Sequence, residues 1–185
     1  MDSLKTVQGF YKAGKIISKV VFILSVVAAA LCVAGILSLA LIPDGVKLGG
    51  VTVTGLLERD AGISVNTCLA YLAMGIFLAV GEAVLCKFAE KYTGRVLDAG
   101  TPFTLEGSKE LVRLGILTLA VPAVSSLLGA IAYAIIKSVL PQVAENNWNN
   151  TFSLGLGVML IFAGFVCRYG AELAAKKSAA DKSEE

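Results

Sequence analysis

The sequence contains no histidine and few charged residues, and both absences narrow the classes of protein to which it can belong. Lys, Arg, Asp and Glu make up 16% of the 185 residues, against about 25% in soluble domains. Without histidine, the chain lacks the most common metal ligand and the usual general base near neutral pH. The composition therefore excludes an ordinary cytosolic enzyme, a disordered chain and a nucleic-acid-binding protein with a basic face.

The four cysteines lie far apart, and none forms the CxxC pair that is typical of zinc and redox motifs. We interpret them as small apolar side chains, because three of the four lie in or beside apolar runs. The sequence also offers no serine beside a predicted base and no paired carboxylates in an apolar run. We therefore expect no catalytic, cofactor-binding or metal-binding residue, and no enzyme.

Long apolar runs dominate what is present: 56% of the residues are hydrophobic and the mean hydropathy is +0.78. A helix needs roughly 20 apolar residues to cross the hydrocarbon core of a bilayer. Four runs are long enough, so we predict an all-α membrane protein with a single four-helix transmembrane domain over residues 1–177. The predicted spans are about 16–42, 64–86, 113–137 and 151–170. Residues 178–185 are small and charged, and we expect a disordered cytoplasmic tail there.

The distribution of basic residues predicts the orientation of these spans. Of the 16 Lys and Arg residues, 13 lie before residue 20, between residues 82 and 113, or from residue 168 onward, and the other three are Lys47, Arg59 and Lys137. Basic residues favour the cytoplasmic side of a membrane. We therefore expect both termini and the central loop to lie in the cytoplasm.

The central loop has a pattern of its own. Apolar residues recur at helical spacing after the second span, which predicts that this span continues as an amphipathic interfacial helix. Gly100 and Pro102 then break the helix, and Thr104 is suited to cap the next one. We interpret Pro102, Phe103 and Thr104 as an elbow that anchors Phe103 in the headgroup layer. A docking surface for a cytoplasmic partner is a compatible alternative.

The first outer loop contains two short runs of β-forming residues on either side of Gly49 and Gly50. This pattern predicts a small β-hairpin, with a ligand-binding cap as the alternative. In the third span, Pro122 predicts a helix kink, which can serve packing or gating.

Two ionisable residues fall at equal depth in the second and fourth spans. Glu82 and Arg168 lie 18 and 17 positions beyond the outer ends of these spans, at Ser64 and Thr151. A lone charge at that depth is costly, so we predict an intramembrane ion pair between Glu82 and Arg168. The alternative is that each side chain reaches the headgroups separately.

Two stretches of the chain carry a resemblance to a known family. They are residues 100–106 (GTPFTLE), followed by 111–115 (LVRLG), and residues 168–173 (RYGAEL). Together they resemble the small four-span bacterial membrane proteins of domain of unknown function 2975. The resemblance covers nearly the whole chain, although residues 174–185 are rich in Ala and Lys where family members often have an acidic segment.

That family has no established activity. The resemblance implies a multi-pass protein of the bacterial cytoplasmic (inner) membrane, often encoded beside a helix-turn-helix regulator, which makes such a regulator a candidate cytoplasmic partner. We expect a non-catalytic sensor, regulator partner or immunity-type protein that lies in the lipid bilayer and binds no nucleic acid directly. The alternative is a small transporter or channel, suggested by Glu82 and Pro122. Four helices leave little room for a pore, so that alternative requires a homo-oligomer.

Overall fold

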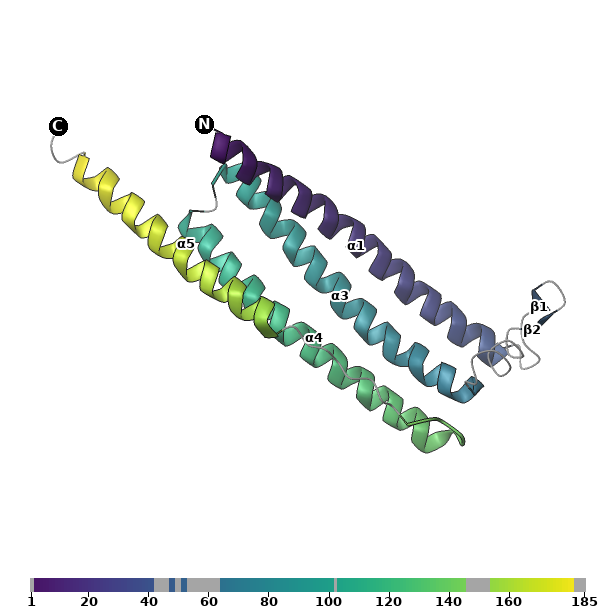
Figure 1. Ribbon diagram of the computed structural model, residues 1–185. Coiled ribbons are helices and arrows are strands. Elements are labelled where there is room, and N and C mark those ends of the chain that lie inside the picture. The colour runs from purple at the N-terminus through teal and green to yellow at the C-terminus, as the bar shows by residue number, and fades with distance from the viewer. Residues whose placement is uncertain are drawn as a thin grey trace. The chain divides into compact units, whose positions relative to one another are not determined.

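Four long helices make up most of the protein (Figure 1). The computed structural model describes residues 2–41, 47–48, 51–52, 64–101, 103–145 and 154–181. The helices are α1 (Asp2–Leu41), α3 (Val65–Ala99), α4 (Leu105–Val139) and α5 (Leu154–Asp181). Two-residue strands, β1 (Lys47–Leu48) and β2 (Val51–Thr52), pair antiparallel, with Lys47 opposite Thr52. Gly49 and Gly50 lie outside the described residues, so the complete hairpin stays a prediction.

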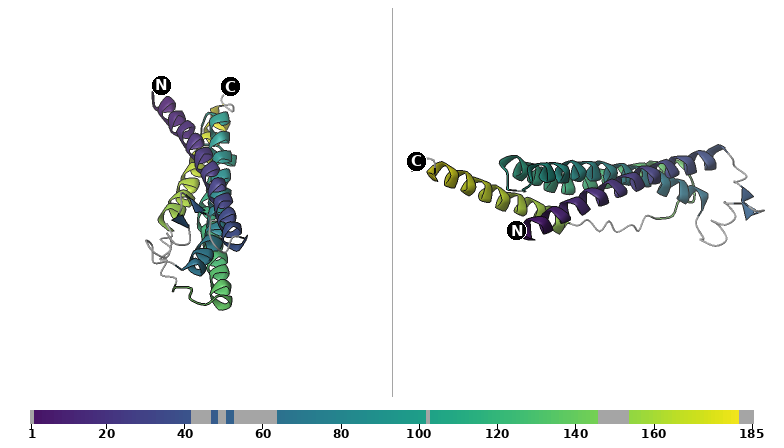
Figure 2. Two further views of the ribbon diagram at one scale, coloured as in Figure 1. Left: turned by 90° about the vertical axis from the view of Figure 1, so that its right-hand side faces the viewer. Right: turned by 90° about the horizontal axis from the view of Figure 1, so that it is seen from above.

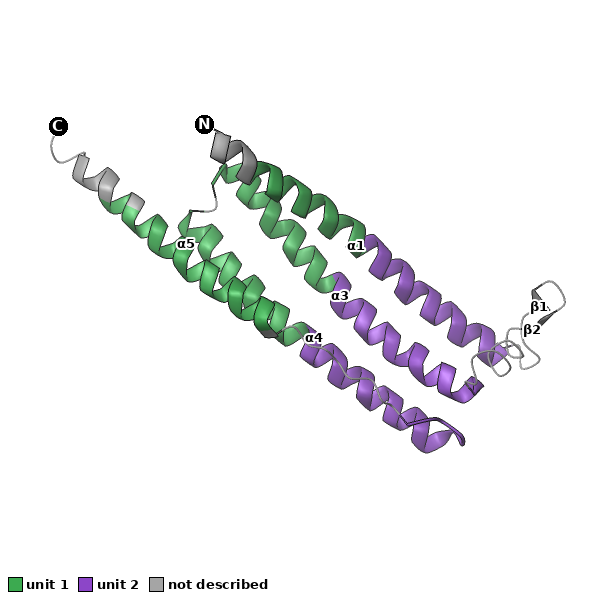
Figure 3. Ribbon diagram, in the orientation of Figure 1, with its two compact units in different colours: residues 1–22, 84–121, 152–185 green, residues 23–83, 122–151 purple. Residues whose placement is uncertain are grey.

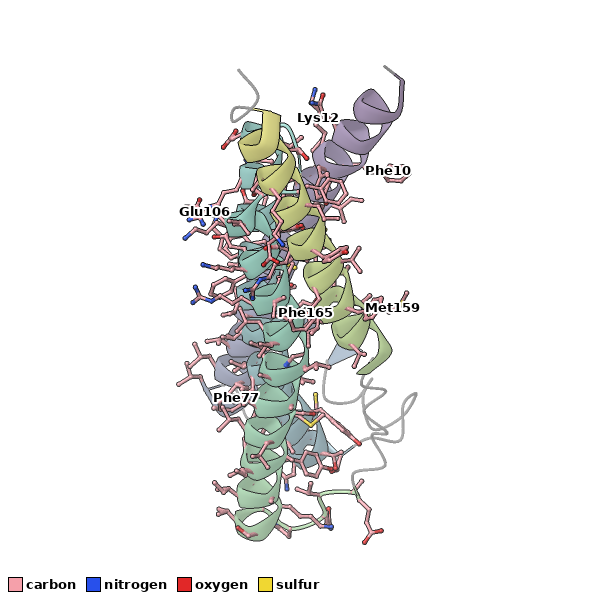
Figure 4. The ribbon with its side chains drawn as sticks, turned by 90° about the vertical axis from the view of Figure 1, so that its left-hand side faces the viewer. Phe10, Lys12, Phe77, Glu106, Met159 and Phe165 are labelled. Carbon is pink, nitrogen blue, oxygen red and sulfur yellow. The ribbon has the colours of Figure 1, made fainter. Side chains whose placement is uncertain are left out.

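All four helices are long and apolar enough to cross a membrane, as the sequence predicts. At most 17% of the residues in their most apolar stretches are buried. Large apolar side chains are instead exposed, and Figure 4 shows Phe10 and Met159, which are 75% and 74% exposed, pointing away from the helices. Apolar surface on this scale is unfavourable in water and is covered by lipid tails in a bilayer. Four such helices define the class, a multi-pass membrane protein.

The helices extend beyond the apolar runs. α3 continues without a break to Ala99, which confirms that the second span runs on as a helix (Figure 2). α5 continues to Asp181, so residues 178–181 are helical where the sequence predicts a disordered tail. The physical reason is that this segment contains two alanines, which are strong helix formers, and no glycine or proline to end the helix. Residues 182–185 lie outside the described part of the chain.

The chain divides into two compact units, coloured in Figure 3. Unit 1 contains residues 1–22, 84–121 and 152–185, and unit 2 contains residues 23–83 and 122–151. α1, α3 and α4 each contribute one segment to each unit, whereas α5 belongs to unit 1. The boundary within α4 falls at Pro122, the residue predicted to kink this helix.

The core of unit 1 forms where the extension of α3 packs against α4, α5 and the start of α1. Tyr92, Val96 and Leu111 are its buried centre, and the ring of Tyr11 meets that of Tyr92 edge-on at 6.2 Å between centroids. Tyr92 and Val96 are two of the apolar residues that recur at helical spacing after the second span, and both are buried in unit 1.

Glycines bring α4 and α5 of unit 1 into backbone contact. A Cβ atom added at Gly115 would lie 2.8 Å from the backbone nitrogen of Ile161 and 3.0 Å from the carbonyl oxygen of Gly157. At Gly164, an added Cβ would lie 2.9 Å from the backbone nitrogen of Val112. Real Cβ atoms do not approach backbone this closely, so these positions need glycine.

In unit 2, contacts join α1 to α3 and α3 to α4. The Cys32 sulfur lies 3.2 Å from the Cβ position of Gly75, and the rings of Tyr71 and Tyr133 lie 5.4 Å apart. The segment that follows α4 is fixed to the start of α3, because Ala144 N–H donates to the buried Thr67 Oγ1 at 3.0 Å. Tyr133 Oη donates to the carbonyl oxygen of the same Ala144 at 2.7 Å.

Candidate functional site

Polar side chains gather in unit 1 where α3 ends and α4 begins. Gly100 ends α3 with a φ of 71°, which a side chain would disfavour. Thr104 Oγ1 then accepts the Gly107 N–H at 2.9 Å and caps α4, which confirms the predicted cap. Glu106 lies in the first turn of α4, where a carboxylate complements the helix dipole.

Phe103, one residue before this cap, contacts α5. Its ring lies against Gly170, since a Cβ added at that glycine would be 3.1 Å from Phe103 Cδ1. The two stretches that carry the family resemblance therefore meet at this point. The Phe103 side chain is still 52% exposed, which leaves room for a role in the headgroup layer. Pro102 lies outside the described residues, so the elbow as a whole stays a prediction.

An open cavity of about 240 Å³ lies between the end of α3 and the start of α4, and we name it the α3–α4 cavity. Its polar lining residues are Arg95, Asp98, Thr104, Glu106 and Glu110. Arg95 forms an ion pair with Glu110 across the two helices. Asp98 and Glu106 are exposed and make no ion pair within the described residues. The cavity therefore presents two carboxylates that no described side chain pairs with, and their charge suits a cationic group.

The side chains around the α3–α4 cavity are suited to binding a cationic group. Within the described ranges, no group of three or more His, Cys, Asp or Glu residues could hold a metal ion. The carboxylates of the cavity can accept hydrogen bonds from the ammonium or guanidinium groups of a ligand.

The predicted pair of Glu82 and Arg168 is not tested by the structure. Arg168 Nε donates to Glu172 Oε1 at 3.0 Å, so Arg168 has a partner one turn further along α5. Glu82 is exposed on α3 and belongs to unit 2, whereas Arg168 belongs to unit 1. The ion pair therefore stays a prediction.

Pro122 lies inside a continuous α4. The kink predicted at this residue also stays a prediction.

Sequence reasoning missed two features of this region. One is the Arg95–Glu110 pair, which joins two helices that only the fold brings together. The other is the close contact of α4 with α5 at Gly115, Gly157 and Gly164. A signal for the second exists in the sequence, because Gly157 and Gly164 are seven residues apart and so return to one helix face.

Comparisons of the chain with protein-family models, with curated proteins and with solved structures find no match. The resemblance to the family of domain of unknown function 2975 therefore stays a prediction.

Proposed function

We propose that this is a non-catalytic protein of the bacterial cytoplasmic membrane that binds a cytoplasmic protein at the α3–α4 cavity. It would act as a sensor, a regulator partner or an immunity-type protein. Both termini and the connection between α3 and α4 face the cytoplasm in this proposal. The observation that carries the proposal is the pair of exposed carboxylates, Asp98 and Glu106, which line an open cavity and make no ion pair within the described residues.

The charge of the cavity defines the partner chemistry. Asp98 and Glu106 lie in a region that is otherwise rich in lysine and arginine, so a basic side chain would be attracted to this one place. Charge complementarity of this kind selects partners and speeds their encounter. A helix-turn-helix regulator, which the family resemblance implies as a neighbour, carries a basic DNA-binding surface. Binding of that surface here would compete with DNA.

Site-specific crosslinking tests the proposal. A photo-activated residue at the exposed Ala99 should crosslink to a cytoplasmic protein, and Asp98→Asn with Glu106→Gln should reduce the yield severalfold. Glu145→Gln, which removes an exposed carboxylate from unit 2, is the matched control and should leave the yield unchanged. Added operator DNA should lower the yield if the partner is a DNA-binding regulator. Equal yields in all variants would contradict the proposal.

A small oligomeric transporter or channel is the second candidate, and the exposure of Glu82 supports it. A carboxylate near the end of an apolar span is costly unless it meets water or a partner side chain. A second copy of the chain would provide either. This function predicts ion or solute flux in proteoliposomes that is lost in Glu82→Gln, and absence of flux in the wild type rejects it.

A further inference from the structure

A second, smaller cavity lies between α3 and α4 in unit 1, on the side away from the α3–α4 connection. It is lined by Phe88, Lys91, Tyr92, Glu110, Arg113, Leu114 and Leu117. Its volume of about 30 Å³ is far below that of a site for a drug-sized ligand, which needs roughly 300 Å³ or more. The cavity admits a small polar group, such as part of a phosphate, while the rest of the ligand lies outside it.

Two basic side chains at this cavity make no ion pair within the described residues. The neighbouring cations are paired, Lys87 with Glu90 and Arg95 with Glu110. Lys91 and Arg113, by contrast, are exposed and make no ion pair in the described part of the chain. Glu110 also lines the cavity, but its carboxylate is engaged by Arg95, so the local charge favours an anion.

An aromatic ring positions one of the two cations at this cavity. The Arg113 guanidinium lies over the Phe88 ring, with 5.6 Å between Cζ and the ring centroid. This cation–π contact fixes one charge and leaves the guanidinium N–H groups free to donate. Tyr92, which is only 6% exposed, lines the cavity beside these cations.

The position of the cavity along the helices matches the headgroup layer of a membrane. Arg113 directly precedes the uncharged run that starts at Leu114, and Lys91 lies five residues beyond the end of the apolar run at Cys86. Leu114 and Leu117 continue from the cationic side chains toward the apolar part of α4. This second cavity thus has positive charge at one end and apolar side chains at the other.

We propose that this second cavity binds a phospholipid with an anionic headgroup. Lys91 and Arg113 contact the phosphate, and Leu114 and Leu117 contact the start of an acyl chain. Basic sites between transmembrane helices at the cytoplasmic side bind acidic lipids by this chemistry. The proposal concerns a different cavity from the one proposed for the protein partner, and either can hold without the other.

Lipid retention by the full-length protein tests the proposal. Native mass spectrometry of the protein in detergent measures its binding of added phosphatidylglycerol and of zwitterionic phosphatidylcholine. We expect a preference for phosphatidylglycerol, and an affinity loss of about fivefold for each of Lys91→Gln and Arg113→Gln. Lys109→Gln is the matched control, because Lys109 is an exposed cation on α4 that does not line the cavity. It should change the affinity less than twofold.

Two further measurements separate the alternatives. Inorganic phosphate and glycerol phosphate, added at the same concentrations, should fail to compete, because they cannot contact Leu114 and Leu117. Effective competition by either ion would show a site for soluble phosphates and overturn the lipid assignment. Equal binding of the two lipids by the wild type, or equal losses in Lys109→Gln and Lys91→Gln, would overturn it as well. Because both cavity variants change exposed side chains, circular dichroism should show unchanged helicity.

Discussion

Replacing Gly115 with alanine should weaken the packing of α4 against α5 in unit 1. The new methyl group would lie 2.8 Å from the backbone nitrogen of Ile161, 3.0 Å from the carbonyl oxygen of Gly157 and 2.7 Å from Ile161 Cγ1. The Ile161 side chain could turn away, but the two backbone atoms move only if the helices move. Relief of the clash therefore requires the two backbones to separate.

The size of the effect follows from these distances. An ordinary contact starts near 3.4 Å, so α4 and α5 must separate by about 0.6 Å, and a gap of that order forfeits a quarter to a half of each dispersion contact it opens. Overpacking of this kind costs about 1–3 kcal/mol. Alanine is also the better helix former by about 1 kcal/mol, which offsets part of the loss.

Gly9→Ala is the control variant that separates the cost of the clash from the gain in helix propensity. Gly9 lies inside α1, and a Cβ added there meets no atom within 4 Å. Both substitutions gain similar helix propensity, so their difference in unfolding free energy should equal the clash, about 1–3 kcal/mol. The assay is reversible unfolding in mixed detergent micelles, followed by circular dichroism. Differences below about 0.5 kcal/mol, which is the usual range for surface substitutions, would refute this account of the contact.

Two further predictions concern local contacts. Gly75→Cys should form a disulfide with Cys32 under a membrane-permeant oxidant, because the Cys32 sulfur already lies 3.2 Å from the Cβ position of residue 75. Phe77→Cys, on an exposed face of α3, is the control and should not form this disulfide. Electrophoresis without reductant distinguishes the crosslinked protein from the uncrosslinked one. Thr104→Ala should lower the unfolding free energy by about 1 kcal/mol through loss of the α4 cap, whereas Thr104→Ser should retain it. Equal stabilities of the two Thr104 variants would contradict the capping role.

The sequence predicts the helices well because their causes are local. Each apolar run is long enough to span hydrocarbon, and backbone groups in lipid must be hydrogen-bonded within the helix. The continuation of α3 follows from the spacing of apolar residues such as Tyr92 and Val96. The start of α4 follows from Thr104, whose side chain bonds three residues ahead. None of these features requires knowledge of which helices pack together.

The sequence does not show which helices pack together at Gly115 or through Arg95 and Glu110, and the reason is physical. Lipid tails are as apolar as leucine, so a helix face gains little from leaving lipid, and hydrophobicity does not mark the packed side. Small residues occur on several faces, and only the structure shows that Gly115 meets Gly157. The Arg95–Glu110 pair and the contact of Thr67 with Ala144 join residues from separate elements. Their pairing depends on the fold rather than on local sequence.

In the proposed function, the connection between α3 and α4 faces the cytoplasm, where a protein partner can reach it. Labelling of single engineered cysteines with a membrane-impermeant maleimide tests this most directly, in a chain whose four native cysteines are replaced by serine. In intact cells, Glu145→Cys should be labelled, whereas Ala99→Cys should react only after the cells are permeabilised; both positions are exposed in the structure. Labelling of Ala99→Cys in intact cells would contradict the proposed orientation and the binding of a cytoplasmic partner.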